Sequence, residues 1–263
     1  MFELKNPKIA VPVVLFAGLL WSFGAPVVRY MNDPHLFTWQ YIFGRGVTIF
    51  ILLNLYLYFE EGVNFYKNYF KIGLSGIIGG SGLGIAMITF IYSITNTSAA
   101  VTLLCLAAMP FFTGLLAFLF LREKISLNVW ISILIASVGL GIMAIDSNEQ
   151  NSLIGFIFGI TSSIGFSIFS VTLRWKEQTP KFTTVAFAGF FCVIFSSIVI
   201  LANEQVFFST SYNSALFSLH GILVCLGLIL YSIGSRAIPA AELTLLSLTE
   251  VIGGIFWVWI PIL

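Results

Sequence analysis

The sequence is poor in charge. Only 9% of its 263 residues are Asp, Glu, Lys or Arg, whereas 59% are hydrophobic. A soluble domain carries about 25% charged residues, so this chain cannot cover a water-exposed surface with polar side chains. The mean hydropathy of +1.01 agrees, and a lipid bilayer is the solvent that suits such a chain. Because the net charge is only +1, we expect no nucleic-acid partner.

Cysteine and histidine are also scarce. Cys105, Cys192 and Cys225 all lie in apolar runs, and such an odd, scattered set predicts neither a disulfide framework nor a metal site. The two histidines, His35 and His220, are isolated, and we expect both near the outer edge of the membrane. Motifs for nucleotide binding, zinc binding or a nucleophilic serine are absent. We therefore expect no metal, no cofactor and no enzymatic activity.

Apolar segments long enough to cross a bilayer are abundant. A membrane helix needs about 20 mostly apolar residues. Nine such segments are predicted, at roughly Ile9–Val28, Leu36–Phe59, Ile72–Thr95, Ser98–Leu121, Leu127–Ile145, Ser152–Leu173, Phe182–Ala202, Phe217–Ser235 and Ile238–Ile262. Turn residues such as Asn32–Pro34 and Asp146–Asn148 separate them. We expect an all-α polytopic membrane protein whose first segment is retained, because no cleavage site follows it.

Lys and Arg are unevenly divided between the two sides of these segments. If the N-terminus is inside, ten of the 12 basic residues fall in inner segments: Lys5, Lys8, Lys67, Lys71, Arg122, Lys124, Arg174, Lys176, Lys181 and Arg236. The outer loops then hold only Arg29, and Arg45 lies within a span. Because Lys and Arg mark cytoplasmic loops, we expect a cytoplasmic N-terminus in the inner (plasma) membrane.

The two halves of the chain share short patterns. The matches are Gly18-x3-Ser22-x-Gly24 with Gly159-x3-Ser163-x-Gly165, Pro34 with Pro180, and Tyr92-Ser93-Ile94 with Tyr231-Ser232-Ile233. With one inserted residue, Pro110 falls opposite Glu250. These matches predict a duplicated five-helix unit, and because five is odd the halves have opposite topology. We expect one repeat over residues 1–146 and a second over 147–263 that lacks its final helix; the alternative is a natural nine-helix protein.

Several segments match the motifs of a known family in order and spacing. They are Leu20–Gly24, Phe43–Gly46, Tyr92 with Ser98–Ala100, Met109 with Pro110, Phe120–Ser126, and Ala240–Leu243 through Leu248–Glu250. With these segments the chain resembles the EamA-type family of the drug/metabolite transporter superfamily. The resemblance implies ten helices in two inverted repeats around a substrate cavity, and export of metabolites or toxic compounds. The chain departs from that pattern in lacking a tenth helix.

Two charged residues are predicted near the middle of the membrane. Arg45 and Glu250 lie about nine and twelve residues inside their spans, which places each roughly 13–18 Å deep in a ~30 Å core. An unpaired charge there costs about 2.5–3.5 kcal/mol, so each needs water or a partner. We expect both to face a central cavity, where Glu250 binds a proton or a cationic group. The alternatives are a fixed Arg45–Glu250 pair or separate bonds to backbone carbonyls.

The other cavity candidates are Trp21, Ser22, Tyr41, Tyr92, Pro110 and Trp257. Aromatic rings with a polar tip suit a cavity for organic ligands, and they suit the membrane interface as well. Pro110 removes a backbone hydrogen bond in mid-helix, which predicts either a kink beside the cavity or a purely structural bend. Glycines at residues 73–84 predict close helix packing, within one bundle or in a dimer.

These features favour a secondary transporter that exports small organic metabolites or drugs by alternating access of its two repeats. The expected partners are a small-molecule substrate and the lipid bilayer, with proton coupling through Glu250 or facilitated exchange. The alternatives are a membrane scaffold or receptor that does not transport, and an intramembrane enzyme. An enzyme would need further acid or base residues close to Glu250.

Overall fold

The computed structural model describes residues 4–124, 126–127, 129–131, 133–135, 138, 153–176 and 179–259. Within these ranges all regular elements are helices. They are α1 (Pro7–Trp21), α2 (Gly24–Tyr30), α3 (Thr38–Glu61), η1 (Gly62–Tyr66), α4 (Lys67–Phe70), α5 (Gly73–Asn96), α6 (Ala99–Leu106), α7 (Met109–Leu116), η2 (Ala117–Leu121), α9 (Leu153–Trp175), α10 (Lys181–Ala202), α11 (Ser211–Gly234), α12 (Ala240–Ser247) and α13 (Thr249–Trp259).

Eight stretches of the described residues are long and apolar enough to cross a membrane. They are Pro7–Tyr30, Thr38–Phe70, Gly73–Asn96, Ala99–Leu121, Leu153–Trp175, Lys181–Ala202, Ser211–Gly234 and Ala240–Trp257. Each overlaps one predicted span, and the remaining predicted span, Leu127–Ile145, lies largely outside the described residues. The chain is therefore a multi-pass helical membrane protein.

Polar caps set several helix starts. Asn6 accepts a hydrogen bond from the backbone N–H of Lys8 at 3.0 Å, and Pro7 occupies the first turn of α1. Thr210 caps α11 in the same way by accepting from the N–H of Asn213 at 3.2 Å. This cap starts α11 at Ser211, so the predicted start at Phe217 is wrong by almost two turns.

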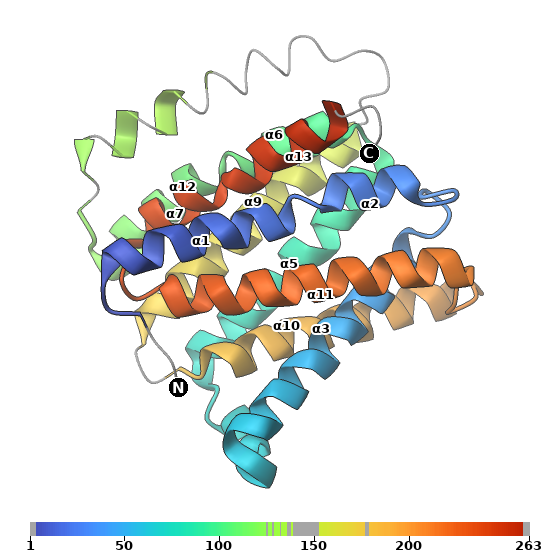
Figure 1. Ribbon diagram of the computed structural model, residues 1–263, viewed down its shortest axis with the longest axis horizontal. Coiled ribbons are helices and arrows are strands. Elements are labelled where there is room, and N and C mark those ends of the chain that lie inside the picture. The colour runs from blue at the N-terminus through green and yellow to red at the C-terminus, as the bar shows by residue number, and fades with distance from the viewer. Residues whose placement is uncertain are drawn as a thin grey trace.

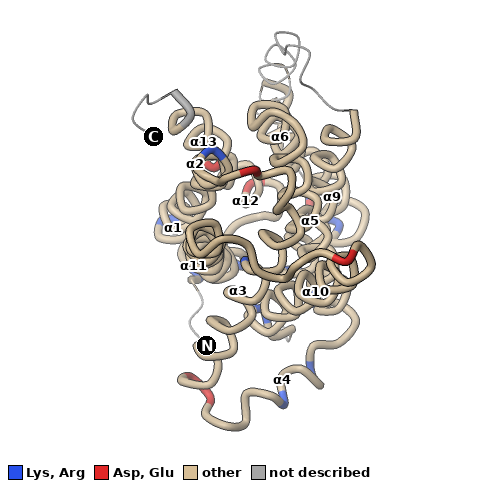
Figure 2. Tube along the Cα trace, turned by 90° about the vertical axis from the view of Figure 1, so that its right-hand side faces the viewer, with Lys and Arg blue, Asp and Glu red and all other residues tan. Residues whose placement is uncertain are grey.

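The helices surround the middle of the molecule, with α5 and α9 on one side and α1 and α11 on the other (Figure 1, Figure 2). Helix α5 also packs against α10, and it is the most buried of the candidate spans, with 72% of its window inside the described bundle. Charged positions are sparse along the whole trace (Figure 2).

Glycines permit these close contacts. A Cβ built at Gly82 would lie 2.9 Å from the carbonyl oxygen of Gly165 in α9, and one at Gly79 would lie 2.1 Å from Oγ1 of Thr172. A Cβ at Gly84 would lie 2.6 Å from the ring of Phe191 in α10. The prediction of tight packing within one bundle is thus confirmed, because these positions have no room for any side chain.

Three of the membrane-crossing stretches are broken. The breaks fall at Ser22 and Phe23 between α1 and α2, at 107–108 between α6 and α7, and at Leu248 between α12 and α13. Pro110, in the first turn of α7, cannot donate to the carbonyl four residues before it, which explains the second break. Breaks at membrane depth need replacement hydrogen bonds.

Hydroxyls of α9 supply these bonds at the α6–α7 break. Ser163 Oγ donates to the carbonyl oxygen of Cys105 at 2.6 Å, and Ser167 Oγ donates to that of Met109 at 3.1 Å. The bend at Pro110 is thus held by the neighbouring helix.

The two ends of the bundle differ in charge. Helices α1, α10 and α12 begin at the end where α9 and α11 finish (Figure 1). We call this the basic end because Arg122, Arg174, Lys181 and Arg236 lie there. The opposite end, called the far end, holds the α2–α3, α5–α6 and α10–α11 connections. At this end Asn213, in the first turn of α11, donates to the carbonyl oxygen of Asn32 in the α2–α3 connection at 3.0 Å.

Candidate functional site

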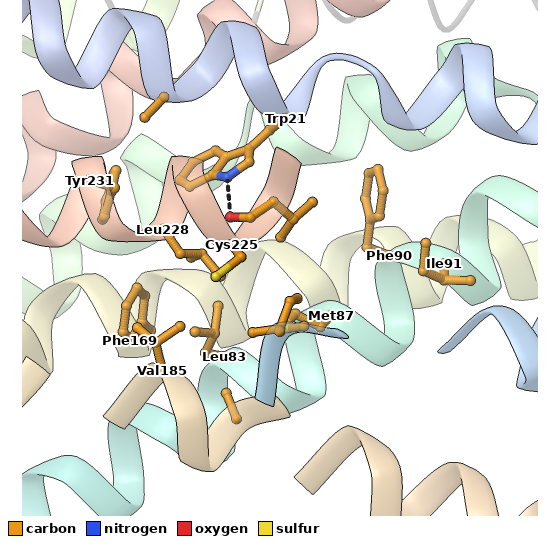
Figure 3. Close-up of a cluster of buried hydrophobic side chains, with 14 of the residues drawn as sticks. Trp21, Leu83, Met87, Phe90, Ile91, Phe169, Val185, Cys225, Leu228 and Tyr231 are labelled. Atoms are coloured by element: carbon orange, nitrogen blue, oxygen red, sulfur yellow. Dashed lines mark hydrogen bonds between the residues drawn. The ribbon is translucent and has the colours of Figure 1, made fainter. Parts of the chain in front are cut away.

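A small cavity lies inside the bundle between the two halves of the chain. Its volume is about 60 Å³, and α1, α3, α5, α6, α7, α9, α11 and α13 all contribute to its lining. Most of the lining is apolar, as the neighbouring wall of Trp21, Leu83 and Met87 illustrates (Figure 3). Sites for organic ligands usually measure about 300–1,000 Å³, so in this conformation the cavity holds only a few water molecules.

Glu250 is the acidic residue of this cavity. It lies in the first turn of α13, directly after the break at Leu248, and is 8% exposed. Its carboxylate makes no hydrogen bond or ion pair with any described residue. The N-terminus of a helix stabilises a negative charge, so the break in this helix provides part of the stabilisation that a buried carboxylate needs.

Arg45 of α3 lines the same cavity and is 3% exposed. Its Nη2 donates to the carbonyl oxygen of Met87 at 2.7 Å, and its guanidinium carbon lies 6.0 Å from the ring centre of Phe90. Its Nε is buried without a hydrogen-bond partner among the described residues. The guanidinium is thus anchored to α5 while part of its donor capacity is unused.

Arg45 and Glu250 attract each other across the cavity but do not form a direct ion pair. An ion pair does join Arg174 and Glu123, at the basic end. The fixed Arg45–Glu250 pair is therefore not formed. The other alternative, a hydrogen bond from each charged residue to a backbone carbonyl, is observed among the described residues for Arg45 but not for Glu250.

The structure corrects the expected place of His220. We expected it near the outer edge of the membrane, but it is 1% exposed and lines the cavity. The reason is the early start of α11 at Ser211, which puts His220 about 13 Å along the helix at 1.5 Å per residue. Its Nδ1 lies 2.5 Å from the hydroxyl oxygen of Tyr41.

Trp21 lines the cavity from α1. Its indole N–H donates to the carbonyl oxygen of Val224 at 3.3 Å (Figure 3), and its ring meets that of Phe166 edge-on at 5.4 Å. Tyr231, whose ring centre lies 5.4 Å from that of Trp21, belongs to the same aromatic group. This bond and the ring contacts hold the indole in place as one wall of the cavity.

The other predicted candidates lie around the cavity but are not among its lining residues. Ser22 accepts a hydrogen bond from the indole N–H of Trp257 at 2.8 Å, at the break between α1 and α2. Tyr92 packs against Phe158, with ring centres 4.4 Å apart. Pro110 follows Met109, which does line the cavity, and Tyr41 reaches it through His220.

A larger hollow lies at the far end of the bundle. Its volume is about 530 Å³, and it is lined by Ala25, Val28 and Arg29 of α2, by Pro34 and His35, and by residues 94–99. We call it the vestibule. Trp21 and Phe90 line the cavity, whereas Ala25 and Ile94, one helical turn further along, line the vestibule.

Helix α2 lines the vestibule and also packs on residues of the cavity. A Cβ built at Gly24 would lie 3.3 Å from the Phe90 ring and 3.4 Å from Cε1 of His220. The missing side chain of Gly24 therefore lets α2 approach two lining residues of the cavity.

The basic end is held together by bonds to charged groups. Arg174 Nε donates to Glu123 Oε1 at 2.7 Å, and its Nη1 donates to the carbonyl oxygens of Ser235 at 2.9 Å and Ile238 at 2.7 Å. Glu123 Oε2 also accepts from the N–H of Ala240 at 3.1 Å, at the start of α12. We call this set the basic-end tie; it joins α9, the segment after η2, and the α11–α12 connection.

Among the described residues no group of three or more His, Cys, Asp or Glu lies close enough together to hold a metal ion. All three cysteines are buried and free. Sequence reasoning missed His220, Ser162 and Phe166 as lining residues. Ser162 occupies the repeat position of Trp21, so the match between the two halves could have identified it as a lining residue. Recognition of Thr210 as a helix cap would have placed His220 inside the membrane.

The helices, the cavity with its two charged residues and the vestibule define a multi-pass membrane protein with an internal polar site. The EamA-like transporter family matches residues 8–145, about half of the chain, and the chain belongs to this family.

Two relatives and one solved structure bear on the chain. An uncharacterized transporter of Helicobacter pylori strain J99 is 30% identical over 167 residues, which are 62% of this chain and 54% of that protein. One from strain 26695 is 25% identical over 256 residues, which are 94% of this chain and 84% of that protein. The chain thus matches about half the length of the first relative. A crystal structure of a protein 15% identical to this chain covers 95% of it, and 87% of itself, with a TM-score of 0.72, which shows the same fold.

Proposed function

We propose that this chain is a secondary transporter that exports small organic metabolites or drugs by alternating access. The observation that carries the proposal is the buried cavity, in which Glu250 and Arg45 face each other without forming an ion pair. A carboxyl group and a guanidinium that do not pair with each other at membrane depth are costly when they are charged. A cargo with polar groups, or water carried in with it, stabilises both.

Alternating access needs a state in which one side is closed. The basic-end tie closes one side of the bundle, while the vestibule approaches the cavity from the other. The cavity of about 60 Å³ must widen to admit a cargo. Separation of α2 from Phe90, and release of the basic-end tie, are the two movements that the proposal requires.

The packing supports two inverted repeats, residues 1–146 and 147–263. The first helix of each half packs on the third helix of the other half, α1 on α11 and α9 on α5. Gly18 of α1 lies against the α12–α13 break, where its Cβ would be 2.9 Å from the carbonyl oxygen of Ser247. Its counterpart Gly159 lies against the α6–α7 break, with a Cβ 2.8 Å from that of Cys105. Helix α1 starts at the basic end and α9 finishes there, as opposite topologies require.

Orientation follows from the basic end. Cytoplasmic loops of membrane proteins are rich in Lys and Arg, so in this proposal the basic end and the N-terminus face the cytoplasm of the inner membrane. The vestibule then faces outward. In an export cycle, release of the basic-end tie would admit cargo from the cytoplasm, and the vestibule would release it.

Within this proposal Trp21 provides an aromatic wall, Arg45 an anchored cation and Glu250 the group that binds a proton or a cationic part of the cargo. Tyr41, Ser22, Tyr92, Pro110 and Trp257 support the cavity from behind or hold its helix breaks. Proton coupling through Glu250 links export to the membrane gradient. Facilitated exchange is the form that transport takes if Glu250 does not titrate.

The test compares cells that express the wild-type chain, Glu250→Gln or Glu242→Gln. Glu242 is a matched control because it lies in the first turn of α12 and does not line the cavity. Cells receive a panel of amines, amino acids, nucleosides and dyes, and intracellular levels are followed with and without a proton uncoupler.

We expect wild type and Glu242→Gln to lower the level of at least one compound, and Glu250→Gln to fail. Equal transport by all three variants would remove Glu250 from the mechanism. No change for any compound with the wild-type chain would overturn the transport proposal for these classes of cargo.

A further inference from the structure

His220 is a polar residue of the cavity to which the transport proposal gives no role. It is 1% exposed, and its Nδ1 lies 2.5 Å from the Tyr41 hydroxyl oxygen. Its Nε2 has no hydrogen-bond partner among the described residues, although the ring lines the cavity. A ring nitrogen that borders an internal cavity and has no partner is available to whatever enters that cavity.

The Tyr41 contact determines which ring nitrogen carries the hydrogen. A neutral imidazole has one donor and one acceptor nitrogen. Tyr41 is fully buried, and His220 is the only hydrogen-bond partner of its hydroxyl among the described residues. If Nδ1 donated to the Tyr41 oxygen, the hydroxyl hydrogen would be buried without an acceptor. Tyr41 therefore donates to Nδ1, and the hydrogen of the ring lies on Nε2.

Packing keeps both rings in this arrangement. The Tyr41 ring stacks on Phe217, one helical turn before His220 in α11, with ring centres 4.8 Å apart. Helix α2 covers the imidazole at Gly24, where a Cβ would lie 3.4 Å from Cε1. The imidazole thus lies between Tyr41 of α3 and the backbone of α2 at Gly24.

We propose that Tyr41 positions His220 as the Nε2–H tautomer, and that this N–H is a working hydrogen-bond donor of the cavity, available to an acceptor of the cargo. The titratable and charged groups around it are Tyr41 and Arg45 from α3 and Glu250 from α13. The lining residues from α1, α5, α6, α7 and α9 carry no titratable group. For its cargo the inference rests on the transport proposal, whereas the tautomer does not depend on it.

The first measurement is nitrogen-15 NMR of the full chain in lipid vesicles with labelled histidine. The sequence has two histidines, so His35→Gln leaves His220 as the only signal. We expect hydrogen on Nε2 in this background, and a mixture of tautomers in Tyr41→Phe. Tyr231→Phe is the control, because its buried hydroxyl bonds to Ser170 at 2.7 Å and does not touch His220.

Hydrogen on Nδ1 in the background protein would overturn the inference, and so would the same tautomer ratio with Tyr41 and with Phe at that position. Neither result depends on transport, so this arm distinguishes failure of the inference from failure of the proposed function.

The second measurement uses two substitutions that keep one nitrogen each. His220→Gln retains an amide N–H close to the position of Nε2, whereas His220→Asn retains a polar atom only near Nδ1, facing Tyr41. For any cargo found in the export test, we expect His220→Gln to keep most of the export rate and His220→Asn to lose it several-fold. If Asn supports export as well as Gln does, the contact with Tyr41 matters only for folding and the proposed role in the cavity is wrong.

Discussion

The two ends of the bundle are built differently. At the far end, the vestibule of about 530 Å³ lies between α2 and the α5–α6 connection. At the basic end, Arg174 and Glu123 join α9 to the start of α12 through an ion pair and several bonds to backbone groups. The apolar core runs through both ends, so it does not explain the difference. Side-chain bonds at the helix ends, rather than the core, therefore distinguish the basic end from the far end.

Removing the basic-end tie should change the difference between the two ends of the bundle more than any other substitution considered. Arg174→Gln loses the ion pair with Glu123 and the bonds to the carbonyls of Ser235 and Ile238. Bonds to charged, partly buried groups make such a loss cost on the order of 2 kcal/mol. We expect faster hydrogen–deuterium exchange in residues 235–248, measured by mass spectrometry in vesicles.

Lys176→Gln is the control for this prediction, because it removes a positive charge that is exposed at the same end of α9. Exchange rates that do not differ between the two variants would show that the tie does not hold α12 in place.

Helices α5 and α9 cross between the two ends of the bundle. Gly82→Ala should disturb this crossing, and we expect its effect to be the second largest. The new Cβ would lie 2.9 Å from the carbonyl oxygen of Gly165, a backbone atom that cannot move aside. Overpacking of this kind costs about 1–3 kcal/mol. We expect a lower thermal midpoint in detergent.

Gly44→Ala is the milder comparison, since its Cβ would meet the Phe217 side chain at 3.2 Å. Equal midpoints for the two variants would contradict the view that the α5–α9 crossing is limited by backbone contact.

Filling the vestibule should affect transport without affecting stability. Ala99→Trp places a large ring in the hollow beside Asn96 and Pro34. We expect export of any cargo to fall several-fold while the thermal midpoint stays the same. Ala100→Trp is the control, because Ala100 is exposed and does not line the vestibule. If both variants export at the wild-type rate, the vestibule is not on the cargo's route.

The smallest of these effects, a small loss of stability, is expected at the α6–α7 break beside the cavity. Ser167→Ala removes the hydroxyl that lies 3.1 Å from the carbonyl oxygen of Met109 and 2.7 Å from that of Ser163 in its own helix. One such bond contributes about 1 kcal/mol. Denaturant titration of the purified protein measures the loss, with Thr161→Ala as the comparison because its hydroxyl bonds only within α9. A loss no greater than that of Thr161→Ala would mean that Pro110 bends the helix without help from α9.

Most helix positions could be predicted from the sequence, because membrane insertion depends on a local average of hydropathy. The predicted first, third, fourth, sixth and seventh spans agree with the structure to within about two residues at each end, apart from the broken regions inside them. The eighth span differs most at its start. Its first turn contains Ser211, Tyr212 and Asn213, which lower the hydropathy of the window although Thr210 caps a helix there.

The candidate site was only partly predictable. Arg45 and Glu250 could be singled out because a charge within an apolar span is costly wherever it points. His220 could not be singled out, because the predicted start of this helix at Phe217 places it near the membrane edge. Ser22 and Trp257 were chosen as cavity residues, yet their side chains bond to each other, since the direction of a side chain depends on the rotation of its helix.

The sequence by itself determined the class of this protein, the approximate positions of its membrane-crossing helices and the concentration of Lys and Arg on one side. These depend on composition and on short stretches of chain. The tertiary structure alone decided that Trp21, Arg45, His220 and Glu250 share one cavity and that the basic end is tied. Such meetings depend on helix rotation and on contacts between residues as far apart in the sequence as Ser22 and Trp257, which no local pattern specifies.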